Sequence, residues 1–388
     1  MMVITTSARS LFAKTSKQQG HFVLSIIVIK QNIVKMILLR ELSLLIAYLS
    51  IIGAELEKFQ VDMGGQMASK HDDYLCAWKK LDEFQVYITK LEPHVDESIV
   101  HHLATFGYTE EQMEKMPLTE SRNCFGLQVR GYRIFNWSHG SGSFTMPEAT
   151  GMIAGRNSTN IHYIVIQAHY SKPFTSKCLY HFPTLSDLPF LFFFLEPDFS
   201  GMNVYYDTVR PNRIATITVF VPSTFTIPPQ VERYQVVWSC NLKLEQPIHI
   251  FATRVHGHWL SRENSVFYRL PNETEYSTLV ARSPQRPQSY IPTDRIYTLL
   301  PEHELVGRCV FNSMSENKST LPGHDGEVEM CNLYAMYYGD DHSNTPVRPR
   351  CLPKRTERPI GLPLPLESEV VLPFDNQQHF QMFVFFVA

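Results

Sequence analysis

The chain has 388 residues, of which 44% are hydrophobic and 19% charged, and its formal net charge is −3 at pH 7. This length predicts two domains of about 150 residues each. The near-neutral charge, without a Lys/Arg cluster, excludes an extended basic surface for nucleic acid or for an acidic membrane. The 25 Phe, 18 Tyr and 25 Pro residues favour β-sandwiches with many turns over helical bundles.

Residues 1–54 form an apolar leader or signal region. Lys30, Lys35 and Arg40 divide "HFVLSIIVIKQNIVKMILLRELSLLIAYLSIIGAE" into runs too short for one membrane helix of about 20 residues. A signal peptide fits better, with Arg40 as its charged start, residues 42–52 as its apolar segment and a small cleavage residue at 53 or 54. The alternative is an uncleaved anchor, and only in that case is a membrane a partner.

Two further features agree with secretion. The seven cysteines lack the CxxC spacing of a zinc site and should mostly pair in an oxidising compartment, although an odd number leaves one over. N-x-S/T sequons, which are usable glycosylation acceptors only in the secretory pathway, occur at Asn136, Asn157, Asn272 and Asn317. We therefore expect a glycoprotein of the secretory pathway, either stored in granules or secreted.

The remaining chain predicts an all-β fold. Short β-branched and aromatic runs such as "FQVYITKL", "IHYIVIQAHY" and "YQVVWSC" are bounded by Pro, Gly, Asn and Ser. Only "YTEEQMEKM" predicts a helix. We expect two antiparallel, jelly-roll-like β-sandwich domains in series at residues 55–212 and 213–370, followed by a tail at 371–388.

The segment "FATRVHGHWLSREN" contains two histidines spaced for a metal. Residues i and i+2 of a strand project to the same side, so His256 and His258 would hold their rings side by side like a chelate. The alternative is a pair of half-exposed strand histidines that share hydrogen bonds. Arg254 would lie on the same face, where it could pair with a carboxylate or simply be a solvated strand charge.

Other candidate ligands are His101 and His102 in "IVHHLATFG", His169 in "IQAHY" and Met330 in "EVEMCNLYAMYY". Adjacent strand residues point to opposite faces, so His101 and His102 can share an ion only at a strand end or bulge, or by offering different ring nitrogens. A buried strand Met is usually a core residue. Imidazoles combined with a thioether nevertheless suit copper, and they predict two unlike copper sites with open positions for oxygen or substrate.

With these motifs the chain resembles the peptidylglycine alpha-hydroxylating monooxygenases, which are two-domain, two-copper enzymes of the secretory pathway. The resemblance covers roughly residues 59–351 and rests on "VHHLATFG", "IQAHY", "RVHGHWL", "GRCVFN" and "EMCNLYAMYY" in the family's order. It implies two copper ions, ascorbate as reductant, O2 as co-substrate and hydroxylation of the terminal glycine alpha carbon of glycine-extended peptides. This is the first step of peptide C-terminal amidation, and a separate lyase would complete it.

The resemblance also implies roles for single residues. It assigns the electron-transfer copper to His101, His102 and His169, and the oxygen-activating copper to His256, His258 and Met330. It implies that Arg254, Asn332 and Tyr334 bind the carboxylate end of the substrate. It pairs Cys76 with Cys124, Cys240 with Cys351 and Cys309 with Cys331, and it leaves Cys178 without a partner.

Departures from the family leave two other functions open. The family usually has a further His and Gly after the HxH pair, where this chain has Trp259, Leu260 and Ser261. One alternative is a dopamine beta-monooxygenase-like hydroxylase acting on a phenethylamine, although the retained carboxylate-binding residues favour a peptide. The other is a catalytically silent, secreted β-sandwich that binds a ligand or partner.

Overall fold

The computed structural model describes residues 57–363, with gaps at 82–84, 116–123, 125–130, 156–160, 172, 174–176, 179–192, 195–196, 223, 324–326, 341–347 and 358; nearer the N-terminus it describes 35–36 and 40–41. The chain divides into two units, residues 1–56 and 57–388. Predictions on leader cleavage and on the tail lie outside the described residues. No helix in the described part is long and apolar enough to cross a membrane.

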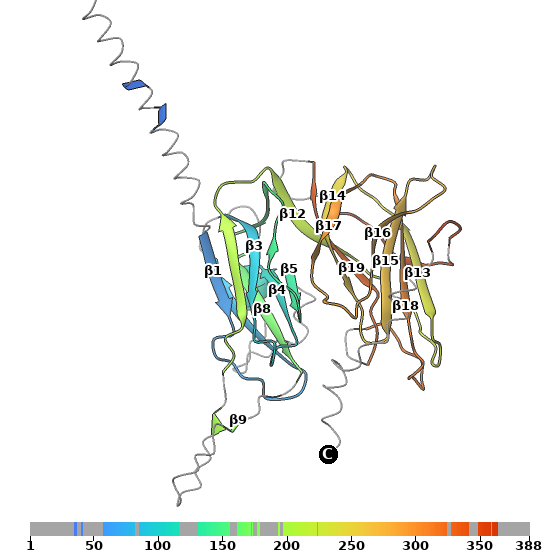
Figure 1. Cartoon of the computed structure of the whole chain (residues 1–388), viewed down its shortest axis with the longest axis horizontal. Coiled ribbons are helices and arrows are strands. Elements are labelled where there is room, and N and C mark those ends of the chain that lie inside the picture. Colours follow the sequence, from blue (N-terminus) through green and yellow to red (C-terminus); the bar gives the residue numbers. More distant parts are fainter. Residues whose placement is uncertain are drawn as a thin grey trace, which may run out of the picture. The chain divides into compact units, whose positions relative to one another are not determined.

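In the described part of the second unit the regular secondary structure is almost entirely β-strand, as the β-branched and aromatic runs predict (Figure 1). Its first half contains β1 Glu57–Asp62, β2 Asp73–Lys80, β3 Val86–His94, β4 His102–Tyr108, β5 Tyr132–Ser138, β6 Phe144–Thr145, β7 Thr150–Ala154, β8 Tyr163–Tyr170, β9 Lys177–Cys178, β10 Phe193–Phe194 and β11 Gly201–Asp207. Its second half contains β12 Arg213–Phe220, β13 Tyr234–Asn241, β14 Ile248–His256, β15 Ser261–Arg269, β16 Ser277–Arg282, β17 Ile291–Leu299, β18 Glu304–Phe311, β19 Asn332–Gly339 and β20 Lys354–Arg355.

The predicted helix is present as α2, Glu110–Glu114, directly after β4. Thr109 and Gln112 form a capping box: the backbone N–H of Gln112 donates to the Thr109 hydroxyl at 3.0 Å, and that of Thr109 donates to the Gln112 side chain at 2.9 Å. This reciprocal cap explains how so short a helix begins sharply at the end of a strand.

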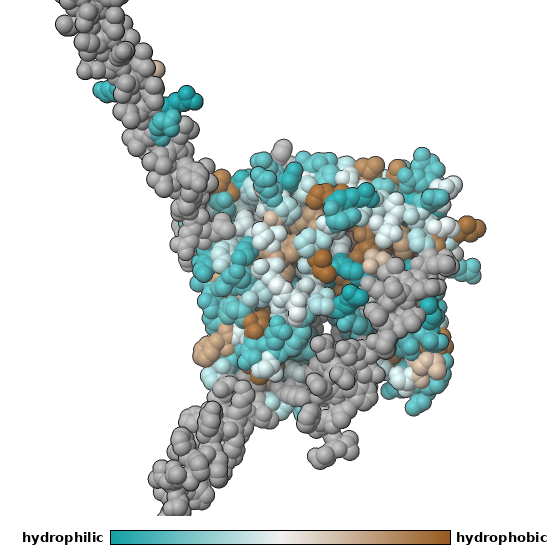
Figure 2. All heavy atoms as spheres, in the orientation of Figure 1, coloured by the Kyte–Doolittle hydropathy of each residue, from teal (hydrophilic) through white to brown (hydrophobic). Residues whose placement is uncertain are grey.

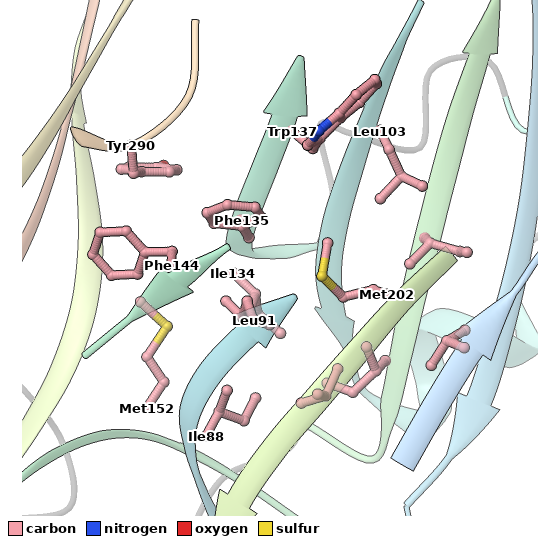
Figure 3. Close-up of a cluster of buried hydrophobic side chains, with 14 of the residues drawn as sticks. Ile88, Leu91, Leu103, Ile134, Phe135, Trp137, Phe144, Met152, Met202 and Tyr290 are labelled. Atoms are coloured by element: carbon pink, nitrogen blue, oxygen red, sulfur yellow. The ribbon is translucent and has the colours of Figure 1, made fainter. Parts of the chain in front are cut away.

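The strands form two layers around each of two hydrophobic cores. The four-stranded sheet β2-β8-β4-β5 packs on the β1-β11-β3-β7 part of a nine-stranded sheet. Leu103 and Ile134 from the first sheet meet Ile88, Leu91 and Met202 from the second (Figure 3). The five-stranded sheet β16-β15-β18-β13-β20 packs in the same way on the β12-β19-β14-β17 part. The predicted all-β sandwich architecture is therefore confirmed.

The nine-stranded sheet is continuous from one core to the other, which the sequence did not predict. Its strands pair antiparallel except for β12 and β7, which pair in parallel with Arg213 opposite Thr150. Parallel pairing needs a long connection between the two strands, and the chain between β7 and β12 supplies it. The strand that begins the predicted second domain is therefore hydrogen-bonded to a strand of the first.

The three predicted disulfides are present, with Cα–Cα distances of 5.9 Å for Cys76–Cys124, 5.6 Å for Cys240–Cys351 and 5.8 Å for Cys309–Cys331. The first ties β2 to the segment beyond α2, and the second ties β13 to the chain before β20. The third joins β18 to the residue that follows Met330. Two of the three bonds therefore constrain the segment from residue 331 onward.

The sequons differ in accessibility. Asn272 and Asn317 are exposed, whereas Asn136 lies inside β5 with only 8% of its surface exposed. Asn157 lies outside the described residues. The sequon argument for secretion therefore rests on Asn272 and Asn317.

Exposed hydrophobic side chains are interspersed with hydrophilic ones on the face shown in Figure 2.

A buried ion pair lies in the second sandwich. The guanidinium of Arg308 donates to the Glu263 carboxylate at 2.6 Å, and the two side chains are 1% and 0% exposed. Arg308 also donates to the carbonyl of Pro363, which draws the C-terminal segment against β18. Removing one member of such a pair leaves an uncompensated buried charge.

We expect Arg308→Leu to lower the free energy of unfolding by about 3–5 kcal/mol, because Glu263 would stay buried without its partner. Urea denaturation of the disulfide-intact protein measures this. Lys115→Met is the control, because it breaks an ion pair with Glu111 whose members are 67% and 74% exposed. That variant should lose no more than about 1 kcal/mol. Equal transition midpoints for the two variants would contradict the expectation.

Candidate functional site

Three predicted histidines meet at one end of the first sandwich. His169 in β8 lies directly opposite His102, the first residue of β4, and the backbone N–H of His101 donates to the His169 carbonyl at 2.8 Å. His101 precedes the strand, so it escapes the alternation that would turn neighbouring side chains to opposite faces. This is the strand-end arrangement that allows adjacent histidines to share an ion.

The three rings present the same nitrogen to one another. The Nδ1 atoms are 3.2 Å apart for His101–His102, 3.2 Å for His101–His169 and 3.3 Å for His102–His169. Imidazole nitrogens bind Zn²⁺, a transition-metal ion of similar size to copper, at about 2.0–2.1 Å. At that bond length two ligand atoms in a tetrahedral arrangement are roughly 3.3 Å apart. The triangle of nitrogens therefore has the size that one ion would require.

Two neighbours that the sequence motifs did not single out hold the His169 ring. Its Nε2 lies 3.1 Å from the Asp72 carboxylate, and its face stacks on Tyr74 with the ring centroids 4.2 Å apart. Tyr74 lies opposite His169 in the β2–β8 pair. A carboxylate behind a ligating imidazole fixes ring orientation and raises ligand basicity, so Asp72 keeps Nδ1 of His169 directed at the other two rings.

The environment favours neutral imidazoles. Burial lowers the pKa of His102 well below its usual value, and the neighbouring His169 and His101 add to the effect. Burial also lowers the pKa of His169, although Asp72 opposes this shift. Metal ligation requires deprotonated imidazole, so the lowered pKa values of His102 and His169 favour the form of these rings that binds an ion.

The second predicted pair lies at the end of β14. His256 is the last residue of the strand, and His258 follows it across Gly257, outside the strand that the sequence predicted to contain both. The two rings still lie close together, with centroids 5.4 Å apart and planes at 77°. A Cβ on Gly257 would come within 2.6 Å of Ser261 and 3.1 Å of the Met330 carbonyl. Glycine therefore lets the histidine turn touch the Met330 segment.

Hydrogen bonds fix which nitrogen of each ring is free. The amide nitrogen of Gln288 donates to the carbonyls of Gly257 and Pro284 at 2.9 and 2.7 Å, so its oxygen must accept from Nδ1 of His256. Nδ1 of His258 donates to the Val328 carbonyl at 2.5 Å. Both rings therefore leave Nε2 with a lone pair for a metal.

Glu329 fastens the histidine turn to the methionine segment. Its buried carboxylate accepts from the backbone N–H groups of His258 at 2.9 Å, Leu260 at 2.6 Å and Met330 at 3.1 Å. Burial raises the pKa of Glu329 to about 7, and these three hydrogen bonds oppose the shift. The Cys309–Cys331 disulfide holds the same segment from the other side. Glu329 is the first residue of the "EMCNLYAMYY" motif and Gln288 lies outside the motifs, and the sequence analysis assigned a role to neither.

The sulfur of Met330 lies beside the end of the histidine strand. Asn332 is opposite His256 in the β14–β19 pair, and its amide donates to the Met330 sulfur at 3.2 Å. Met330, which precedes β19, is half-buried, and this distinguishes it from the fully buried core residue Met336 within that strand. The residues present therefore fit a metal that accepts both imidazole and thioether.

A cationic cluster adjoins this second site. Arg254, on β14, is 7% exposed, and its guanidinium lies 4.7 Å from the ring centroid of Tyr334 on β19. Asn332 donates to the Tyr334 hydroxyl at 3.3 Å, while its own side-chain oxygen is buried without a hydrogen-bond partner. The three predicted carboxylate-binding residues are therefore brought together.

Arg254 has no acidic partner among the described residues. Its Nε donates to the carbonyl of Gln288 at 2.6 Å, and burial lowers its pKa. Burial alone would raise the pKa of Tyr334, but the guanidiniums of Arg133 and Arg254, together with hydrogen bonds from Asn332 and Arg254, lower that pKa. A buried guanidinium without a counter-ion is costly, so the cluster suits an anionic ligand.

A β-sandwich protein with a three-imidazole site and a second histidine pair beside a thioether has the ligand sets of a two-centre copper protein. Comparison with protein families identifies the class directly. Residues 59–177 match the N-terminal domain and residues 213–354 the C-terminal domain of the copper type II ascorbate-dependent monooxygenases. Together these matches span well over half of the chain, which therefore belongs to this family.

Curated relatives include two kinds of monooxygenase. Peptidyl-glycine alpha-amidating monooxygenase A of Xenopus laevis is 26% identical over 72% of this chain, and its mouse counterpart is 25% identical over 80%. The human DBH-like monooxygenase protein 1 is 24% identical over 74% of the chain. The chain spans 28% and 30% of the length of the first two relatives and 48% of the third. Similar identities to both kinds leave the substrate class to be argued from the site.

The family's chemistry uses copper, ascorbate and O2. Copper, when bound, supplies the one-electron and oxygen chemistry. The chain's own residues hold the imidazoles in their ligating tautomers, through Asp72, Gln288 and the Val328 carbonyl. They also place a buried cation beside the second site, where it can orient a substrate C–H bond.

Proposed function

We propose that the protein hydroxylates the alpha carbon of a C-terminal glycine in glycine-extended peptides, the first step of peptide C-terminal amidation. In this reaction one atom of O2 is inserted into the Cα–H bond, and the other leaves as water after taking up two protons and two electrons from ascorbate. His101, His102 and His169 would bind the electron-transfer copper. His256, His258 and Met330 would bind the copper at which oxygen reacts.

The observation that carries the proposal is the guanidinium of Arg254, which is buried beside the second metal site without an acidic partner among the described residues. A peptide carboxylate would neutralise it through charge-assisted hydrogen bonds. The Tyr334 hydroxyl and the Asn332 amide offer further polar contacts. Anchoring the carboxylate fixes the neighbouring alpha carbon, so the position hydroxylated would follow from the position of Arg254.

A phenethylamine hydroxylase is the second candidate, favoured by the similarity to a DBH-like monooxygenase. Its amine substrate carries a positive charge, and placing that charge beside Arg254 would add repulsion to the desolvation cost. The cluster therefore supports the carboxylate substrate.

The product would need a separate lyase to complete amidation. We place the protein in the secretory pathway, in granules or secreted, because three disulfides require an oxidising compartment.

The test compares three substrates under ascorbate and O2: a peptide ending in glycine, the same peptide ending in glycinamide, and tyramine. We expect the free carboxylate to be the preferred substrate, with kcat/KM about 10- to 150-fold lower for glycinamide, because hydrogen bonds to charged groups contribute about 1.5–3 kcal/mol. Arg254→Gln should remove most of this discrimination. Preferential turnover of tyramine would refute the peptide proposal and favour the amine.

A further inference from the structure

We propose that Arg133 and the buried hydroxyl of Tyr290 form a second anion subsite that selects peptides with an acidic residue before the terminal glycine. The inference rests on the proposed function and names its substrate class more closely. Neither residue belongs to a motif, and they come from different sandwiches: Arg133 from β5 and Tyr290 from the segment before β17.

Arg133 reaches the substrate cluster from the first sandwich. Its guanidinium lies 5.1 Å from the Tyr334 ring centroid, the ring that Arg254 contacts at 4.7 Å. A bulge at Ile134 separates Arg133, opposite Phe106, from Phe135, opposite Thr105. Bulges change the direction of side chains at functional sites, and this one directs the Arg133 side chain towards Tyr334 on β19.

The contacts of Arg133 are with aromatic rings, Tyr334 and Phe106, and no ion pair or hydrogen bond joins it to any described residue. Arg254 is likewise without a carboxylate. Two guanidiniums thus share one tyrosine with no described acid to balance them. An anionic ligand would relieve their mutual repulsion, and a ligand with two negative charges would compensate both.

Tyr290 supplies an independent indication. Its hydroxyl is buried and has no hydrogen-bond partner in the described part of the chain. Its ring stacks on Phe135, with centroids 6.0 Å apart, two residues from Arg133 (Figure 3). Arg254 and Arg133 are among the charges that act on this hydroxyl. A buried O–H without an acceptor among the described residues, in the field of two cations, is suited to donate to an incoming carboxylate.

The two guanidiniums differ in exposure, and this difference indicates which part of a bound peptide each would contact. Arg254 is 7% exposed, whereas Arg133 is half-buried. The terminal carboxylate would therefore take the deeper Arg254, and the preceding side chain would meet Arg133 nearer the solvent. A glutamate or aspartate in that place would supply the second charge.

The experiment uses the full, copper-loaded chain and two N-acetylated peptides that differ only in ending Glu-Gly or Gln-Gly. We expect kcat/KM for Glu-Gly to exceed that for Gln-Gly by about tenfold, the value of one charge-assisted contact at a partly exposed position. Arg133→Gln should remove the preference by lowering the Glu-Gly value about tenfold and the Gln-Gly value less than about threefold. Tyr290→Phe should reduce the same preference.

Arg213→Gln is the matched control, because Arg213 also lies over a tyrosine of β19, Tyr338, at 4.9 Å. It should keep the wild-type preference. Calorimetric titration of both peptides into the copper-depleted protein gives a readout independent of turnover, and the same difference in Kd is expected. Equal values for the two peptides with the wild-type protein, or equal losses with Arg133→Gln, would overturn the subsite. Failure to turn over either peptide would instead count against the proposed function.

Discussion

Replacing Met330 with Ile should abolish turnover while leaving the fold intact. The side chains are of similar volume, and Met330 is only half-buried, so packing changes little. The thioether, however, is the soft ligand that favours the reduced copper ion at the second site. Substituting a residue that hydrogen-bonds to a metal ligand typically lowers metal affinity or activity 10- to 100-fold, and losing the ligand itself should lower activity further. Oxygen consumption with ascorbate and a glycine-extended peptide measures the loss, and circular dichroism checks the fold.

Met314→Ile is the matched control for this variant, because Met314 is 49% exposed in a turn outside the site. It should retain wild-type turnover. Near-normal activity in the Met330 variant would show that its sulfur is not a ligand.

Replacing His102 with Ala should reduce bound copper from two ions per chain to one and bring turnover to background. The substitution removes one of three Nδ1 atoms that lie 3.2–3.3 Å apart, and the remaining two cannot close the site. The second site lies on other strands and should keep its ion. Atomic absorption on desalted protein gives the copper count, and steady-state kinetics gives the activity.

His162→Ala is the control for the first site, because His162 precedes β8 at the end opposite His169. It should bind two copper ions per chain. If the His102 variant also bound two and turned over substrate at the wild-type rate, the histidine triad would not be a metal site.

The residues with direct chemical signals were predictable from the sequence. Residue types and spacing indicated the histidines as candidate ligands, and the family resemblance added the ligand role of Met330. A strand end was one of three arrangements expected to let His101 and His102 share an ion. The three disulfides followed from the family resemblance and are present. The strands followed from β-branched runs, and the lone predicted helix followed from a local pattern that the Thr109–Gln112 cap reinforces.

The supporting residues were not predictable, because their roles depend on contacts distant in sequence. Asp72 meets His169 across 97 positions, and Glu329 meets His258 across 71. The parallel β7–β12 pair is likewise a long-range contact that periodicity cannot reveal. His258 was expected within the strand, but β14 ends at His256, because Gly257 allows a turn against the Met330 segment.

The most direct test of the two-site account is X-ray absorption of the ascorbate-reduced protein, combined with a copper count. The account predicts two copper ions per chain, with imidazole scattering from both and a sulfur scatterer that disappears in Met330→Ile. A count below one ion per chain after careful loading, or a sulfur signal unchanged in that variant, would contradict it.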